Sequence, residues 1–459
     1  MGSRTSRLCI HLSLDDGDRL PPSQNPEEPM LLAVWVDDVS HHPPSAKLLS
    51  QSRQLAYAAK VWDESELLAL EAEEETKKGW GNACDPALNR DFGQDVLAAV
   101  QRNNAQQASF IDEPMVYADP CKHPEHLRQN GEMIMKEESS VRGLLPLASL
   151  NSPLGGGEII GPTTVGRKAI APYMPWSAKT EHRLWWRGNA HSAFYYDKWD
   201  WRAGQRLRLS DFASGRRERM EAEMAGGMGM SAEERGSPVL LEREERVRRE
   251  WREREVLRET YLNVSLISTQ RAWSCGGHYA HVFFCNTEDG RPNATCPQDK
   301  ACDAVMDAEY DFAPYADKAY ELKHKFRLDI DGFGWTTRWR EELSKNNVVI
   351  KITLYPEWWT PQAIPWYHYI PGSYTFNDLY DIMAFFTGTP EERAGEISEK
   401  RRVVLVERDK MAEEIAARGR EFAMTRLRYE DMRVYMFLLL LEYRRAWSDD
   451  RKAATFKLD

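Results

Sequence analysis

The hydrophobic pattern is clearest in the C-terminal third of the chain, where short apolar runs are separated by polar and glycine-rich turns. Residues 326–330 (FRLDI) and 348–352 (VVIKI) are rich in apolar and β-branched residues over the length of a strand and predict two strands. Residues 331–334, with the sequence DGFG, predict a tight loop, and residues 335–343 predict a helix. A strand, a loop, a helix and a second strand in this order indicate an α/β fold with a parallel sheet.

The pattern after this unit predicts mostly helices. Residues 402–406 predict either a strand or the start of a helix. Residues 408–447 predict long helical segments, interrupted near Gly419 and at a turn over residues 428–431. Near the other end of the chain, residues 53–78 predict a helix with an acidic end.

Three segments are polar, charged or rich in turn formers. Residues 1–30 are polar and contain proline, so we expect a disordered tail. Residues 146–180 are rich in Gly, Pro and Ser, which is typical of a loop or a connection between domains. In residues 215–260 Glu and Arg alternate densely, which favours a solvated helix with ion pairs four residues apart. This charged segment is either a surface insertion or a helix that binds a partner.

Composition and charge narrow the class of protein. The chain has 459 residues, and a prior of about 150 residues per domain suggests two or three domains. Its net charge of −11 disfavours nucleic-acid binding. The longest apolar run, over residues 434–441, is far shorter than the roughly 20 residues of a membrane span. The first residues contain no apolar h-region, so no signal peptide is visible.

The cysteines leave several interpretations open. There are seven, and four of them lie within residues 275–302. Disulfides, a zinc site with His278 and His281, and free buried thiols all fit this clustering. Two sequons, at Asn263 and Asn293, are compatible with a secretory protein.

The glycine loop carries the first candidate chemistry. A loop that leaves a strand and enters a helix presents free N–H groups and the positive end of the helix dipole, which favour phosphate oxygens. Arg338 and Arg340 would add charge-assisted bonds to a diphosphate. A purely structural turn is the alternative. Asp329 and Asp331 have a spacing that suits a divalent metal, but residues two apart in a strand share one face and would equally line one pocket wall.

Residues 326–371 resemble the signature of glycosyltransferase family 90, the capsule-associated glycosyltransferases, which also contains the Rumi-type protein O-glucosyltransferases. The family pattern is a strand, D-G-x-G-[FW]-[ST]-x-R-[FW], a second strand, E-W, and then P-W-x-H-Y-[IV]-P, and nearly every part occurs here in order. Residues 112–116 (DEPMV), 184–188 (LWWRG) and 415–443 are also similar to family segments. The resemblance covers roughly residues 80–447.

The resemblance implies a GT-B-like α/β architecture, with two Rossmann-like halves facing a cleft and a long C-terminal helical region. Residues 31–175 would form the acceptor-side half, which contains the general base. Residues 176–447 would form the half that binds the nucleotide sugar, with the charged insertion at 215–260. Residues 1–30 and 448–459 would be tails.

The resemblance also implies roles for individual residues. Asp112 would be the general base, although the residues alone favour a capping or turn role for an Asp before Glu-Pro. The donor-binding residues would be Asn189, Arg206, Asp331, Gly332, Phe333, Gly334, Trp335, Thr336, Arg338 and Glu357. No metal or other cofactor would be required, because the Rumi-type reaction is metal-independent.

The implied function is inverting transfer of xylose or glucose from a UDP-sugar to a hydroxyl of a glycan or protein. The family is expected in the lumen of the secretory pathway, so the missing signal suggests a truncated chain, an incorrect start or a member that is no longer secreted. Met115 replaces the Arg of the family's D-E-P-R-V. Two alternatives therefore stay open: a catalytically degenerate relative that binds sugar nucleotides or glycans, and an intracellular scaffold that uses the Glu/Arg helix.

Overall fold

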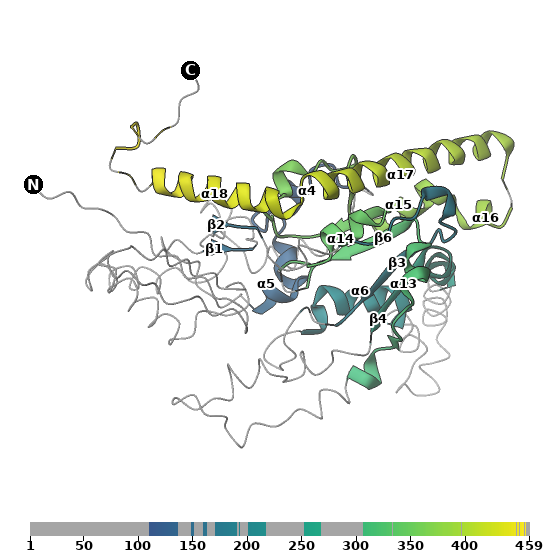
Figure 1. Ribbon diagram of the computed structural model, residues 1–459. Coiled ribbons are helices and arrows are strands. Elements are labelled where there is room, and N and C mark those ends of the chain that lie inside the picture. Colours follow the sequence, from purple (N-terminus) through teal and green to yellow (C-terminus); the bar gives the residue numbers. More distant parts are fainter. Residues whose placement is uncertain are drawn as a thin grey trace, which may run out of the picture.

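The structure, a computed structural model, describes a parallel sheet with helices on both faces (Figure 1). The described residues are 110–135, 148–150, 159–162, 170–190, 192, 201–216, 252–267, 306–332, 334–395, 397–446, 448, 450–453 and 455. The predicted helix at 53–78, the polar tail at 1–30 and most of the charged segment at 215–260 lie outside them.

Six strands form the main sheet, in the order β5-β4-β3-β6-β7-β8, and every pairing is parallel. The strands are β3 (Leu184–Gly188), β4 (Leu262–Ile267), β5 (Phe312–Ala313), β6 (Phe326–Ile330), β7 (Val348–Ile352) and β8 (Ile370–Pro371). The chain adds strands outward from β3 on one side, then returns beside β3 and adds strands on the other side. This is the strand order of doubly wound folds, and its switch point lies between β3 and β6.

Helices cover both faces of the sheet, and every residue of the central strands β6 and β7 is buried. The helices are α4 (Pro114–Tyr117), α5 (Gly131–Met135), α6 (Gln205–Ser214), α13 (Lys318–Leu322), α14 (Trp339–Ser344), α15 (Asp378–Thr387), α16 (Pro390–Arg393), α17 (Glu399–Thr425) and α18 (Tyr429–Ala446). Leu328 and Ile350 pack with α6 and α15 in the larger core, whereas Val349 packs with α14 and the end of α17 in a second core. Figure 1 shows α17 and α18 along one side of this assembly.

A second, two-stranded parallel sheet lies against α18. It pairs β1 (Ala148–Ser149) with β2 (Ile159–Ile160). The hydroxyl of Tyr435 in α18 donates to the Ile160 carbonyl at 3.1 Å. This bond joins residues far apart in the sequence.

The predicted strands at 326–330 and 348–352 are confirmed with the same bounds. The α/β class and the parallel sheet are confirmed as well. The predicted helix at 335–343 begins later, at Trp339, because residues 335–338 are used by the loop, where the N–H of Gly332 donates to the Trp335 carbonyl at 2.9 Å. Residues 402–406 are helical and belong to α17.

The predicted helix interruption near Gly419 is wrong. Helix α17 continues through Gly419 to Thr425, and the chain breaks only before α18 begins at Tyr429. Gly419 is buried where the helix crosses residue His368, and a β-carbon there would lie 2.5 Å from the His368 carbonyl oxygen. The glycine therefore permits a close helix crossing and does not end the helix. Among the described residues, no helix is both long and apolar enough to cross a bilayer.

Candidate donor-binding site at the switch point

The predicted donor residues Asn189 and Asp331 follow β3 and β6, the two strands on either side of the switch point. Arg206, in the first turn of α6, joins them. Its Nη1 donates to Asn189 Oδ1 at 2.6 Å, and its Nε donates to the Asp331 carbonyl at 3.0 Å. Its Nη2 donates to the Ile330 carbonyl at 3.3 Å. Arg206 therefore links the carboxyl ends of the two strands by hydrogen bonds.

The carboxylates of Asp329, in β6, and Asp331, directly after it, share a single buried cation. The ammonium of Lys351, on the neighbouring strand β7, lies 3.1 Å from Asp329 and 3.2 Å from Asp331. Burial by itself would lower the pKa of Lys351, but the two carboxylates raise it above its usual range. The ammonium thus occupies the position between the two carboxylates that a D-x-D metal site would use.

The loop after β6 is held by its own side chains. Gly334 has a φ of 71°, a conformation that glycine adopts without a Cβ penalty. The hydroxyl of Thr336 donates to Asp329 at 3.0 Å, so it is engaged within the loop. Trp335 is half-buried. Phe333 lies outside the described residues.

Arg338 is the predicted donor residue with a cationic group still available. Its Nη1 donates to the Arg187 carbonyl in β3 at 2.6 Å. Its Nη2 is buried and has no hydrogen-bond partner among the described residues, and the same holds for Nε of Arg187. Because a buried N–H group without a partner costs free energy, these two groups favour a bound anion or water.

Both arginines line a cavity of about 330 Å³ that lies over the sheet between α13 and α14. Five cationic and three acidic side chains line it: Arg187, Lys318, Arg327, Arg338 and Lys345, with Glu321, Glu341 and Glu342. Arg327 pairs with Glu342 at 2.6 Å, and Lys345 pairs with Glu342 at 3.1 Å and with Glu341 at 3.3 Å. The remaining positive charge lies toward the carboxyl ends of β3 and β6.

Glu357 is buried behind the loop, after β7. Burial raises its pKa to about 8, although Lys351 acts in the opposite direction. One carboxyl oxygen of Glu357 is buried and has no hydrogen-bond partner among the described residues. At neutral pH this carboxyl is therefore largely protonated and offers both a donor and an acceptor.

Asp112 lies on a segment that is tied to the same edge of the sheet. The hydroxyl of Tyr117 accepts from the Tyr374 N–H at 2.9 Å, and Asn130 Nδ2 donates to the Tyr374 hydroxyl at 3.1 Å. Tyr374 follows β8, and its hydroxyl donates to Asp331 at 3.3 Å. The structure therefore brings Tyr117, five residues after Asp112, to the carboxyl edge. Next to Asp112, the Ile111 carbonyl accepts from Trp366 Nε1 at 2.7 Å, before β8, and no contact joins Asp112 to the donor residues in the described part of the chain.

The side chain of Asp112 itself is exposed. The N-cap of α4 is Glu113, and it makes no side-chain cap bond. The capping role that the residues alone suggested for Asp112 is therefore absent from α4.

Three residues of this site have no role in the sequence prediction. Lys351 is a charged residue inside an otherwise apolar strand, a signal visible in the run VVIKI. Arg187 lies in the quoted run LWWRG without an assigned role. For Tyr374 the sequence gives no signal, because its bond to Asp331 depends on the return of the chain after β8.

The comparisons with known proteins agree with this C-terminal assignment. Residues 313–450 match Glycosyl transferase family 90. Protein O-glucosyltransferase 1 from Rattus norvegicus is 25% identical over 122 residues, which is 26% of this chain and 26% of that protein. The matched part thus spans about a quarter of the length of this curated relative. Asp331 to Glu357 lie inside the family match, whereas Asp112, Asn189 and Arg206 precede it. The C-terminal part of the chain, residues 313–450, is therefore similar to glycosyltransferase family 90.

Proposed function

We propose that this protein is an inverting glycosyltransferase that moves xylose or glucose from a UDP-sugar to a hydroxyl of a glycan or protein. One observation carries the proposal: the residues assigned to the donor, Asn189 and Asp331, follow the two strands that flank the switch point. Nucleotides bind α/β sheets in the crevice at this position. The family assignment supports glycosyl transfer in general.

The available charge at this edge suits a diphosphate. The leaving group of the reaction is a diphosphate, whose developing charge needs cationic and N–H donors aimed at it. Arg338 has a free buried N–H in its guanidinium, and Arg187 has another. A guanidinium binds phosphate oxygens with charge-assisted bonds. In this proposal Arg206 mainly stabilises the carboxyl ends of β3 and β6, because its nitrogens already donate to Asn189, Ile330 and Asp331.

The chemical step requires one base. The acceptor hydroxyl attacks the anomeric carbon, and its proton passes to the carboxylate of Asp112. The new bond between the acceptor oxygen and the anomeric carbon forms as the bond between that carbon and the diphosphate oxygen breaks, and the electron pair leaves with UDP. The ammonium of Lys351 already lies between Asp329 and Asp331, so the proposal assigns no metal to this pair.

The architecture and location belong to the same proposal. Residues 31–175 would supply a second Rossmann-like half, completing a GT-B-like cleft over the carboxyl edge. We place the protein in the secretory lumen. Cys121 is disulfide-bonded, which fits an oxidising compartment and counts against an intracellular scaffold.

A catalytically degenerate relative is the competing candidate, because Met115, three residues after the proposed base, stands where the family pattern has an arginine. Such a protein would bind the donor without turning it over. Measured turnover therefore separates the two candidates.

The test compares Asp112→Asn with Glu113→Gln, two exposed neighbouring carboxylates. We expect Asp112→Asn to lower sugar transfer by roughly a hundredfold to ten-thousandfold, the usual contribution of a general base, with unchanged UDP affinity. Glu113→Gln should retain activity. Full transfer by Asp112→Asn would refute the base assignment, and no transfer by the unmodified chain with retained UDP binding would favour the degenerate relative.

A further inference from the structure

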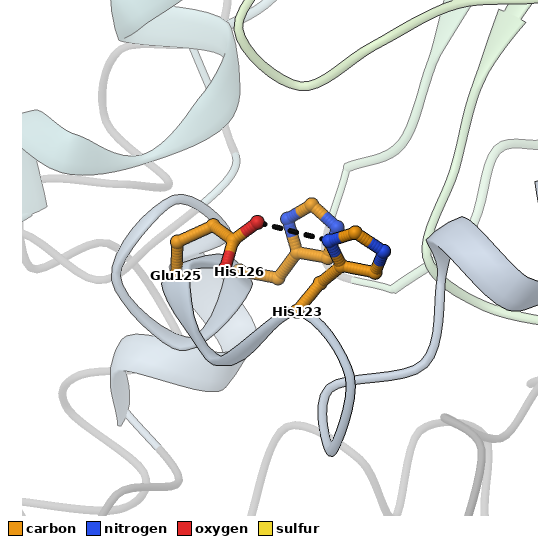
Figure 2. Close-up of side chains that lie close together, drawn as sticks. All are labelled: His123, Glu125 and His126. Carbon is orange, nitrogen blue, oxygen red and sulfur yellow. Dashed lines mark hydrogen bonds and ion pairs between the residues drawn. The ribbon is translucent and has the colours of Figure 1, made fainter. Parts of the chain in front are cut away.

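Three potential metal ligands lie within four residues, well away from the glycine loop in sequence. His123 precedes the short 3-10 helix η2 (Pro124–Arg128), and Glu125 and His126 lie within it. One ligand atom from each side chain lies within 4.8 Å of the other two. Figure 2 shows the two imidazole rings and the carboxylate gathered beside this turn.

The ring of His126 is oriented in the way that a metal ligand requires. Its Nε2 lies 2.8 Å from the Tyr117 carbonyl, and a carbonyl only accepts, so Nε2 carries the proton. The lone pair is therefore on Nδ1. Metal-binding histidines characteristically donate their other N–H to a carbonyl or carboxylate, which fixes this tautomer.

The lone pair of His126 is buried without a partner. His126 is 1% exposed, and its Nδ1 has no hydrogen-bond partner among the described residues. Buried polar atoms are rarely left unpaired in folded proteins. An acceptor nitrogen in this state takes either a cation or the amide N–H of Gln129, a neighbouring side chain whose Oε1 is also buried without a hydrogen-bond partner among the described residues.

The ligand atoms of His123 and Glu125 already lie about as far apart as two ligands of one metal ion do. Nδ1 of His123 lies 3.0 Å from Oε1 of Glu125, and Glu125 is 2% exposed. Ligand atoms bonded to one zinc ion at about 2.0–2.2 Å lie roughly 3–3.5 Å from one another. The edge of the cluster at His123 remains partly exposed, so an ion has a route from solvent.

We propose that His123, Glu125 and His126 form a binding site for a divalent transition-metal ion, with zinc as the reference ion. Two imidazoles and one carboxylate suit zinc and its first-row neighbours, whereas magnesium and calcium prefer all-oxygen sites. Three protein ligands leave one tetrahedral position for water. The site is independent of the proposed glycosyl transfer.

The consequence of metal binding is local order at the carboxyl edge. The ion would fix the His126 ring, which holds the Tyr117 carbonyl. The hydroxyl of Tyr117 in turn contacts Ser373 at 3.1 Å and the Tyr374 N–H at 2.9 Å. The ion would therefore stabilise the docking of residues 117–126 onto the end of β8.

The test measures zinc binding to the full chain by titration calorimetry, with thermal unfolding recorded before and after a chelator. Two variants address the ligands: His126→Gln, whose amide still donates to the Tyr117 carbonyl, and His123→Ala at the partly exposed position. His182→Ala, an exposed histidine outside the cluster, is the matched control. We expect about one zinc per chain at this site, an affinity at least about tenfold lower in both ligand variants, and a melting temperature raised by zinc only in the unmodified chain and the control.

Equal zinc affinity in all four proteins would overturn the assignment, because the ion would then bind elsewhere, for example among the cysteines at 275–302. Absence of zinc binding in a folded unmodified chain would also overturn it. The cluster would then be a hydrogen-bonded element of the fold. Neither result depends on sugar transfer, so neither bears on the proposed function.

Discussion

The guanidinium of Arg206 and the side-chain amide of Asn189 are joined by a 2.6 Å hydrogen bond that spans the switch point of the sheet. The same guanidinium donates to the carbonyls of Ile330 and Asp331 at the end of β6. This single side chain, 8% exposed, therefore fastens two strand ends that define the proposed donor site.

Arg206→Ala should lower the free energy of unfolding by about 1–3 kcal/mol, because it leaves buried acceptors unpaired. Urea denaturation measures this loss. Arg202→Ala is the control, since Arg202 forms a partly exposed pair with Glu309 and should cost no more than about 1 kcal/mol. Equal losses in the two variants would show that the hydrogen bonds of Arg206 stabilise the fold no more than a partly exposed ion pair does.

Arg338→Ala should weaken UDP binding about 10-fold to 100-fold, because a hydrogen bond to a charged group contributes roughly 1.5–3 kcal/mol. Calorimetric titration with UDP measures the change. Arg340→Ala, in the first turn of the helix that Arg338 precedes, is the matched control. The Nε of Arg340 donates to the Ala423 carbonyl, and Arg340 does not line the cavity. If the two variants lose affinity equally, Arg338 has no direct contact with the diphosphate.

Glu357→Gln should change how stability depends on pH. Burial raises the pKa of Glu357 from 4.5 to about 8, so the folded state holds its proton more tightly than the unfolded state does. This group therefore contributes stability that is lost as the pH rises from about 4.5 through about 8, by up to about 1.4 kcal/mol per pH unit. Urea denaturation at pH 5, 6.5 and 8 should show a smaller decline in the Gln variant than in the unmodified chain. Glu357→Asp, which still titrates, should retain the decline, and identical slopes in all three would contradict the assignment.

Gly419→Ala should destabilise the protein by about 1–3 kcal/mol, although alanine is the better helix former by about 1 kcal/mol. The added β-carbon would meet the His368 carbonyl oxygen at 2.5 Å and a Leu343 methyl at 3.0 Å. Ala417→Gly, at an exposed position of the same helix, isolates the propensity effect and should cost about 1 kcal/mol. A stabilised Gly419→Ala protein would mean that the crossing at His368 relaxes easily.

The sequence predicts best where local pattern and tertiary burial agree. The runs at 326–330 and 348–352 are buried throughout because both faces of these parallel strands are covered, and apolar residues predominate in both, so the sequence predicts their type and bounds. Strand β4 is not predicted, because its run LNVSLI mixes polar and apolar residues. Its Asn263 is a sequon residue, yet in the structure its side-chain oxygen accepts from Arg187 at 2.8 Å within the sheet.

The candidate site is only partly readable from sequence for a different reason. The motif identifies Asp331 and Arg338, but the residues that pair with their charged groups lie in other strands. Lys351 neutralises Asp331 from β7, and the carbonyl of Arg187 holds Arg338 from β3. Such cross-strand relations follow from the strand order, which no local pattern encodes. The cluster of His123 and His126 depends in the same way on the Tyr117 carbonyl that orients one ring.

The most direct test of the account is a binding and hydrolysis screen of the purified chain against a panel of nucleotide sugars, with Mg²⁺ or Mn²⁺ present and absent. We predict saturable binding and turnover of one UDP-sugar, at a level that the added ions do not change, and weaker binding by Arg338→Ala. A chain that folds but binds no UDP-sugar would contradict it, and the loop at Asp331 to Thr336 would then serve only the fold.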